Sequence, residues 1–277
     1  MVKGGAPPWM ENYAYFPNAG KPAAMSTTLP MRLFLLRVTM GLMASAMFLS
    51  IGAFLTYIPS GSVGMGGAYN AGLSTIITLV AAYHYRAILM ARAGAAGLSK
   101  RDEELEVDGL RHSDWLVTLP LLVLKLYSVI INPERELIFD NPELSALMAM
   151  LMILFGAVAR LALDWGLSFE DMGQMQRIFV FACYLVSVGI LVVLLIDLGS
   201  TQADSASPGL LWSFFLVWIG YPIVAIGSFL ARSTNGADSE WLSLFKDVTY
   251  ALLDLWSKAV FAWWTASRAF GIRFLDA

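Results

Sequence analysis

Long apolar runs alternate with short polar connections along the whole chain. A helix needs roughly 20 apolar residues to cross the hydrocarbon core of a bilayer. Seven runs are long enough: Met31–Tyr57, Ala71–Ala91, Ser113–Ile131, Leu144–Leu163, Arg177–Leu198, Leu210–Ala231 and Lys246–Phe270. The runs are continuously apolar rather than alternating, so they are helices and not the strands of a membrane barrel. The pattern predicts an all-α membrane protein, a single bundle of seven transmembrane helices.

Turn and loop signals separate these runs. They are Pro59-Ser60-Gly61, Lys100 to Asp108, Asn132-Pro133, Ser168 to Gly173, Ser205 to Gly209 and Asn235-Gly236. Because the connections are short, consecutive helices are expected to pack antiparallel. We expect residues 1–30 to form an extramembrane tail, residues 31–270 the helical domain and residues 271–277 a short C-terminal tail.

Composition agrees with a membrane protein. Apolar residues make up 58% of the chain and charged residues only 14%, against about 25% charged residues in soluble domains. The net charge of −3 gives no basic surface for nucleic acid. The single cysteine, Cys183, lies inside an apolar run and cannot form an internal disulfide, so we interpret it as a packing residue.

Lys258 is a charged residue at the centre of the last apolar run. A lysine at this depth in a bilayer is costly and is usually kept for a function. Asp254 precedes it by four residues, so it lies on the same helix face and can neutralise the amine. The alternative is a structural ion pair between helices.

The third run carries four polar residues on one helix face. Arg111, Asp114, Thr118 and Lys125 are spaced by 3, 4 and 7 residues. Asp114 and Lys125 are therefore roughly 16 Å apart along the helix axis. A carboxylate, a hydroxyl and an amine at successive depths indicate an ion or proton pathway. Considered alone, Arg111 lies at the helix end, where the alternative is that its side chain extends to the membrane surface and has no part in a pathway.

His84 lies near the end of the second run, between Tyr83 and Tyr85. The tyrosines are typical of an interfacial aromatic belt, and His84 could be part of it. Because the second and third helices are antiparallel, His84 is also expected near Asp114. An imidazole that binds a buried carboxylate can retune that group's pKa.

The sixth run contributes Trp218 and Tyr221, which share a face at i and i+3, and Pro222, which is expected to kink the helix. Aromatic residues at a kink could simply pack. They could equally line a slot for a flat apolar ligand, with Trp115 of the third run as the opposite wall.

Together these motifs resemble those of the microbial rhodopsins, seven-helix retinal proteins. Three motifs occur in the order of the family: Arg-x-x-Asp-Trp-x-x-Thr-x-Pro from Arg111, Trp-x-x-Tyr-Pro from Trp218 and Asp-x-x-x-Lys from Asp254. The resemblance covers about Arg32 to Phe270. His84 narrows it to the proteorhodopsin and xanthorhodopsin branch, where a histidine of the second helix partners the counterion.

The resemblance implies that Lys258 binds all-trans retinal as a Schiff base. It makes Asp114 the primary counterion and proton acceptor, Asp254 the second counterion and Arg111 the cation that stabilises both carboxylates, with Thr118 beside them. The implied retinal pocket contains Trp115, Leu122, Met152, Gly156, Trp218, Tyr221, Pro222 and Ser257. An apolar residue at position 122 resembles the green-absorbing members.

Two positions depart from the commoner members of the branch. Lys125 stands where most pumps carry a carboxylate that returns a proton from the cytoplasmic side. A lysine at this position resembles a minority of the branch, of which the Exiguobacterium rhodopsin is an example. Lys125 can serve only if it is neutral when it loads a proton. Ala225 replaces a bulky aromatic residue near the retinal ring, which leaves a roomier pocket.

These features predict a light-driven outward proton pump rather than an enzyme, with no metal site. The acidic Asp114 favours protons over chloride. The alternatives are a photosensor that signals through a separate partner and a light-gated channel, which the scarcity of carboxylates on the second helix disfavours. We expect the lipid bilayer and protons as partners, a homo-oligomer and no nucleic acid. The positive-inside rule weakly favours a cytoplasmic N-terminus, but the family implies an outside N-terminus and a cytoplasmic C-terminus.

Overall fold

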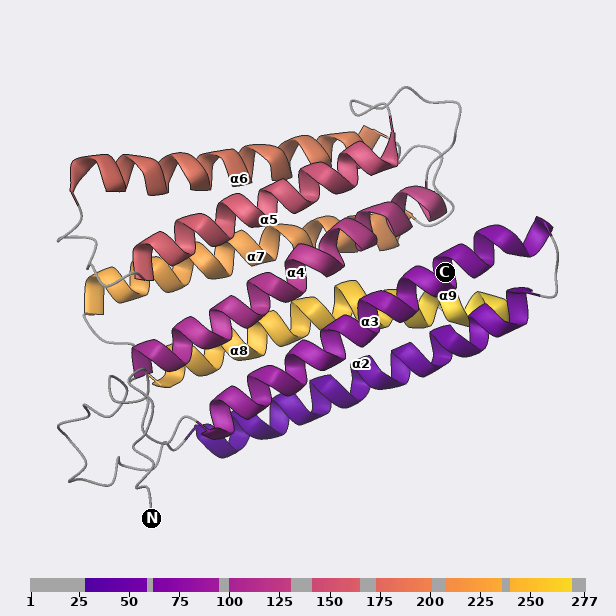
Figure 1. Ribbon diagram of the computed structural model, residues 1–277, viewed down its shortest axis with the longest axis horizontal. Coiled ribbons are helices and arrows are strands. Elements are labelled where there is room, and N and C mark those ends of the chain that lie inside the picture. The colour runs from indigo at the N-terminus through magenta and orange to yellow at the C-terminus, as the bar shows by residue number, and fades with distance from the viewer. Residues whose placement is uncertain are drawn as a thin grey trace, which may run out of the picture.

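Seven helical rods make up the computed structural model, which describes residues 28–58, 62–94, 100–130, 141–164, 173–200, 208–235 and 240–270. The first six rods are α2 (Leu29–Tyr57), α3 (Ser62–Gly94), α4 (Lys100–Ile130), α5 (Pro142–Asp164), α6 (Gln174–Ser200) and α7 (Pro208–Asn235). The seventh consists of α8 (Glu240–Asp254), the π-helical segment η3 (Leu255–Val260) and α9 (Phe261–Ala269). Each predicted run is helical, and the described ranges contain no strand, so the predicted fold class is confirmed (Figure 1).

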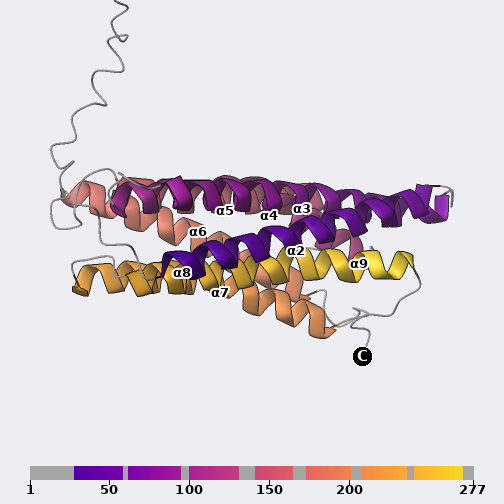
Figure 2. The same cartoon turned by 90° about the horizontal axis from the view of Figure 1, so that it is seen from below.

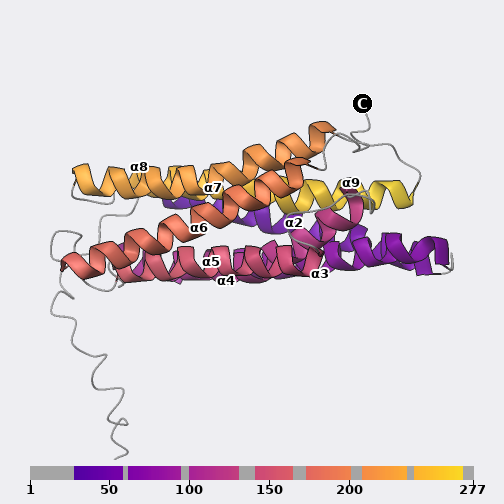
Figure 3. The ribbon, with the colours of Figure 1, turned by 90° about the horizontal axis from the view of Figure 1, so that it is seen from above.

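The rods form two layers. Seen from below (Figure 2) and from above (Figure 3), α3, α4 and α5 lie in one layer, and α7, α8 and α9 lie in the other. At the two sides of the bundle, α2 packs on α3 and α9, and α6 packs on α5. The third helix, α4, therefore lies beside the seventh rod, which brings the two motifs with buried charges to the centre.

The expected loop from Lys100 to Asp108 is wrong. These residues form the first two turns of α4, where Asp102 and Glu103 are favoured by the positive end of the helix dipole. Pro208 and Gly209, also expected in a loop, begin α7, and proline is well suited to a first helical turn. The other predicted connections lie outside the described residues, except for Gly173 and for Asn235, which ends α7. Residues 1–27 and 271–277 also lie outside the described residues.

A π-helical segment interrupts the last rod at Leu255–Val260, and Lys258 lies within it. Such segments are rare and are frequent at functional sites. The apolar pattern predicts only a helix here and not the wider turn. Pro222, in contrast, lies inside an unbroken α7.

Within the described residues, four helices are long and apolar enough to span a membrane by these properties alone: α2, α3, α5 and α6. Most of the buried charged residues lie on two of the other three rods, α4 and the seventh. Cys183 is buried with Ala159 and Val180, as expected of a packing residue.

Candidate functional site

Two carboxylates meet the amine of Lys258 at the centre of the bundle. Its Nζ lies 2.5 Å from Oδ2 of Asp114 on α4 and 3.1 Å from Oδ1 of Asp254 at the end of α8. All three side chains are buried. The contact to Asp254 is the i, i+4 pair that the sequence suggests, and the contact to Asp114 joins two helices.

The two carboxylates have different surroundings. Asp254 accepts hydrogen bonds from Tyr85 Oη at 2.8 Å, Tyr221 Oη at 2.6 Å and Trp115 Nε1 at 3.2 Å, besides its ion pair with Lys258. Asp114 is bound through Oδ2 to the lysine, and among the described residues its buried Oδ1 has no hydrogen-bond partner. Donors stabilise the ionised form of a carboxylate. Asp254 therefore has more donors to an ionised carboxylate than Asp114 has.

A cavity of about 590 Å³ opens beside Lys258. Its walls include all eight residues expected to line a retinal pocket, from Trp115 and Leu122 to Pro222 and Ser257, together with Thr118 and Ala225. Trp115 and Tyr221 meet edge to face, with ring centroids 5.0 Å apart. An amine at the wall of a large apolar cavity has the chemistry to bind an apolar aldehyde covalently.

Gly156 is one of the small residues on this wall. A Cβ atom at this position would lie 3.4 Å from Oγ of Ser187 on the next helix. A Cβ there would make an ordinary van der Waals contact with α6 beside the cavity.

The deeper polar residues of α4 are buried but differ in their contacts. The hydroxyl of Thr118 donates to the backbone oxygen of Asp114 at 2.9 Å, not to its carboxylate. Lys125 is 1% exposed. Its Nζ lies 3.4 Å from the carbonyl oxygen of Phe261 and 4.0 Å from the centre of that residue's ring. Among the described residues, no carboxylate contacts Lys125.

His84 is half-buried on α3, and its Nδ1 donates to the carbonyl oxygen of Val80 at 2.9 Å. Its ring also meets Tyr83 edge to face. The described contacts include no hydrogen bond between His84 and Asp114. The contact that the sequence suggested remains a prediction.

Arg111 departs from its expected position. Its guanidinium donates to Oδ1 of Asp108 at 3.2 Å and to Asp247, and it lies 5.0 Å from the ring centroid of Tyr250. We expected it to stabilise Asp114 and Asp254. Instead it points towards a second group of charged residues at the α4 N-terminus.

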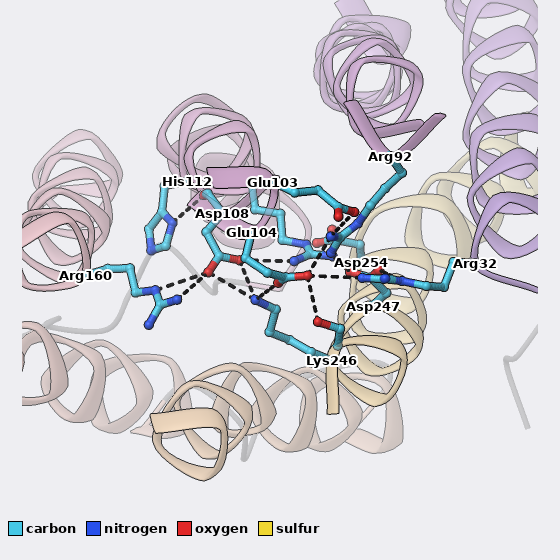
Figure 4. A network of polar contacts seen from close by, with 12 residues as sticks. Arg32, Arg92, Glu103, Glu104, Asp108, His112, Arg160, Lys246, Asp247 and Asp254 are labelled. Atoms are coloured by element: carbon cyan, nitrogen blue, oxygen red, sulfur yellow. Dashed lines mark hydrogen bonds and ion pairs between the residues drawn. The ribbon is translucent and has the colours of Figure 1, made fainter. Parts of the chain in front are cut away.

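This second group, the charged network, is the main feature that the sequence analysis missed (Figure 4). It contains five cations and four carboxylates: Arg32, Arg92, Arg111, Arg160, Lys246, Glu103, Glu104, Asp108 and Asp247. Three of the carboxylates, Glu104, Asp108 and Asp247, each contact three cations. The network joins α2, α3, α4, α5 and α8.

The network keeps Glu104 ionised. Burial alone would raise the pKa of Glu104, but Lys246 at 2.5 Å and Arg92 at 2.6 Å outweigh this effect and hold its pKa well below the usual range. The available signal in the sequence was the spacing of Glu104, Asp108 and Arg111 by 4 and 3 residues, which places them on one helix face.

Comparisons with known proteins identify the family and agree with the fold. The family model described as "Bacteriorhodopsin-like protein" matches residues 35–270, and the chain therefore belongs to this family of microbial rhodopsins. Membership implies a retinal chromophore and an integral, multi-pass position in a membrane, in a family of transporters rather than enzymes. No protein of curated function matches the sequence.

Several solved structures have the same fold. Xanthorhodopsin, a light-driven ion pump with dual chromophore, is 20% identical, with a TM-score of 0.65 over 88% of this chain and 94% of that chain. The rhodopsin of Exiguobacterium sibiricum is 16% identical, with a TM-score of 0.59 over 86% and 96%. A light-driven proton pump from Leptosphaeria maculans is 19% identical, with a TM-score of 0.58 over 90% and 96%. At these identities the likeness shows the fold alone.

Proposed function

We propose that this protein is a light-driven pump that moves protons outward, with its N-terminus outside and its C-terminus in the cytoplasm. The unequal surroundings of Asp114 and Asp254 support this proposal most. A pump needs one carboxylate that can take a proton from the nitrogen of Lys258 and another that stays charged beside it. Asp114, with one donor and an unpartnered oxygen, suits the first role, and Asp254, with four donors, suits the second.

The cavity suits all-trans retinal bound to Lys258 as a Schiff base. When bound, retinal would supply light absorption and the change of shape that starts transport. Trp115 and Trp218 would hold its chain between them, and Leu122, Met152 and Gly156 would contact it farther along the cavity. The small Ala225 leaves space at the cavity wall.

Lys125 is proposed to return a proton to the nitrogen of Lys258. Its amine contacts Phe261, which lies three residues beyond Lys258 on the same rod, roughly one helical turn away. A buried amine without an anion beside it favours the neutral form. Lys125 would therefore take up a proton when water reaches it from the cytoplasmic side, and pass it on.

Illumination of cells that contain the retinal-loaded protein tests this function. We expect sustained acidification of the medium that a protonophore abolishes. Illumination without any pH change, from a protein that absorbs visible light, would support the photosensor instead. The homo-oligomer expected from the family is a separate prediction.

A further inference from the structure

Asp247 is a buried carboxylate that the proposed transport steps do not use. It lies on α8, is 1% exposed and contacts arginines from three other helices. Arg32 Nε of α2 lies at 2.9 Å, Arg92 of α3 at 3.1 Å, and Arg111 of α4 also donates to it. Breaking a buried ion pair by removing one partner is strongly unfavourable. Asp247 therefore holds the three guanidinium groups at this end of the bundle.

Arg111 lies between two acidic positions on the seventh rod. Asp247 and Asp254 are seven residues apart, hence on one face of α8 and roughly 10 Å apart along its axis. Tyr250 lies between them in the chain, and the Arg111 guanidinium contacts its ring while binding Asp247. Arg111 also precedes Asp114 by three residues on α4. Its guanidinium is therefore held on the Asp247 side of the site although both acidic positions are near.

We propose that Asp247 is a positioning residue that holds Arg111 in the charged network and away from Asp114. A cation within about 4–6 Å of a carboxylate favours the ionised form. Arg111 turned towards Asp114 would therefore weaken the ability of Asp114 to accept a proton. Among the described residues, Oδ1 of Asp114 has no hydrogen-bond partner, so it is an acceptor that a guanidinium turned towards it could bind. The inference rests on the proposed function, in which Asp114 is the proton acceptor.

Other charged and titratable groups also face the two side chains. Around Arg111 they are Asp108 of α4, Tyr85 of α3, and Asp247 and Tyr250 of α8. Around Asp114 they are His84 of α3, Tyr221 of α7, Asp254 and Lys258. Any variant of Asp247 changes both the charge of the network and the position of Arg111, so the test must separate these two effects.

Glu104 offers the matched control. It lies in the same network and binds Arg32 and Arg92, two of the three arginines that bind Asp247, but its third cation is Lys246 and not Arg111. Glu104→Gln and Asp247→Asn thus remove the same charge from the same network. Only the second removes a partner of Arg111.

The experiment measures the midpoint of the acid-induced red shift in the visible absorption of the full-length, retinal-loaded protein. We expect Asp247→Asn to move the midpoint to lower pH by about one unit and Glu104→Gln to move it clearly less. Asp247→Glu should restore the wild-type midpoint. In an Arg111→Gln background, the difference between the Asp247 and Glu104 variants should disappear, because the residue that transmits it is gone.

Equal shifts in the two single variants, or a difference that persists without Arg111, would overturn the inference. If Asp247→Asn fails to fold, Arg32→Gln/Asp247→Asn and Arg32→Gln/Glu104→Gln provide a charge-balanced pair. Failure of the proposed function looks different, because then illumination of the coloured wild-type protein produces no pH change, or Asp114→Asn leaves the acid-induced shift in place.

Discussion

The two halves of the bundle on either side of Lys258 differ in how many opposite charges surround their buried charged residues. In the charged network, three carboxylates each contact three cations. At the other end, the described contacts of Lys125 are a backbone carbonyl and an aromatic ring. Paired charges stabilise one another and resist a change of protonation. In a buried amine without an anion beside it, no opposite charge offsets the cost of burying the charged form. We therefore expect the network to fix positions and Lys125 to exchange protons.

The largest effect is expected at the junction of the two halves. Lys258→Ala should abolish visible absorption while the apoprotein still folds, because Lys258 is the amine at the cavity wall between Asp114 and Asp254. The measurement is an absorption spectrum after addition of all-trans retinal. A coloured Lys258→Ala protein would refute the assignment of the binding residue.

Asp114→Asn should stop transport and shift the absorption to longer wavelength. The substitution removes the proton acceptor, and it removes a negative charge that stabilises the cation at Lys258 in its ground state. Light-induced pH changes and absorption spectra measure the two effects. Asp114→Glu serves as the control, since it keeps a carboxylate and should retain proton transfer. An Asp114→Asn protein that pumps at the normal rate would exclude Asp114 as the acceptor.

Lys125→Ala should slow the return of the proton to Lys258 by roughly a hundredfold, a typical loss when a proton donor is removed. The rate should also fall as pH rises, because protons must then come directly from solution. The early loss of the proton should stay near normal. Flash kinetics across a range of pH values measure both steps, and unchanged return rates would leave Lys125 without a part in transport.

A pair of lysine variants sharpens the contrast in stability. Lys246→Met removes the cation that binds both Glu104 and Asp108, and it should destabilise the protein by about 3–5 kcal/mol. Lys125→Met removes an amine that contacts no carboxylate among the described residues, and it should leave stability unchanged or raise it. Thermal unfolding of both variants in the same detergent measures the difference. Equal destabilisation would mean that Lys125 also depends on a paired charge.

Much of the fold and of the central site follows from the sequence. The seven apolar runs predict the seven rods, because a helix that crosses a membrane must be apolar over most of its length. The i, i+4 spacing of Asp254 and Lys258 predicts their contact. The aromatic and small residues of the three motifs line one cavity, which the family resemblance implied and local spacing could not have shown.

The charged network could not be predicted in the same way. A cluster of charges such as Lys100 to Asp108 is typical of an exposed loop, and hydropathy cannot show that Glu104 and Asp108 are buried by partners on other helices. Arg111 binds Asp247, which is 136 residues away in the sequence. The π-helical turn at Lys258 could not be predicted either, because the apolar pattern there is that of any buried helix.

Time-resolved infrared spectroscopy can show directly whether Asp114 takes the proton from the nitrogen of Lys258. We expect a carboxylic acid C=O band to appear after a flash at the same rate as the nitrogen loses its proton. The band should be missing in Asp114→Asn and shifted in Asp114→Glu. A band that persists unchanged in Asp114→Asn, with the nitrogen still losing its proton, would contradict the account.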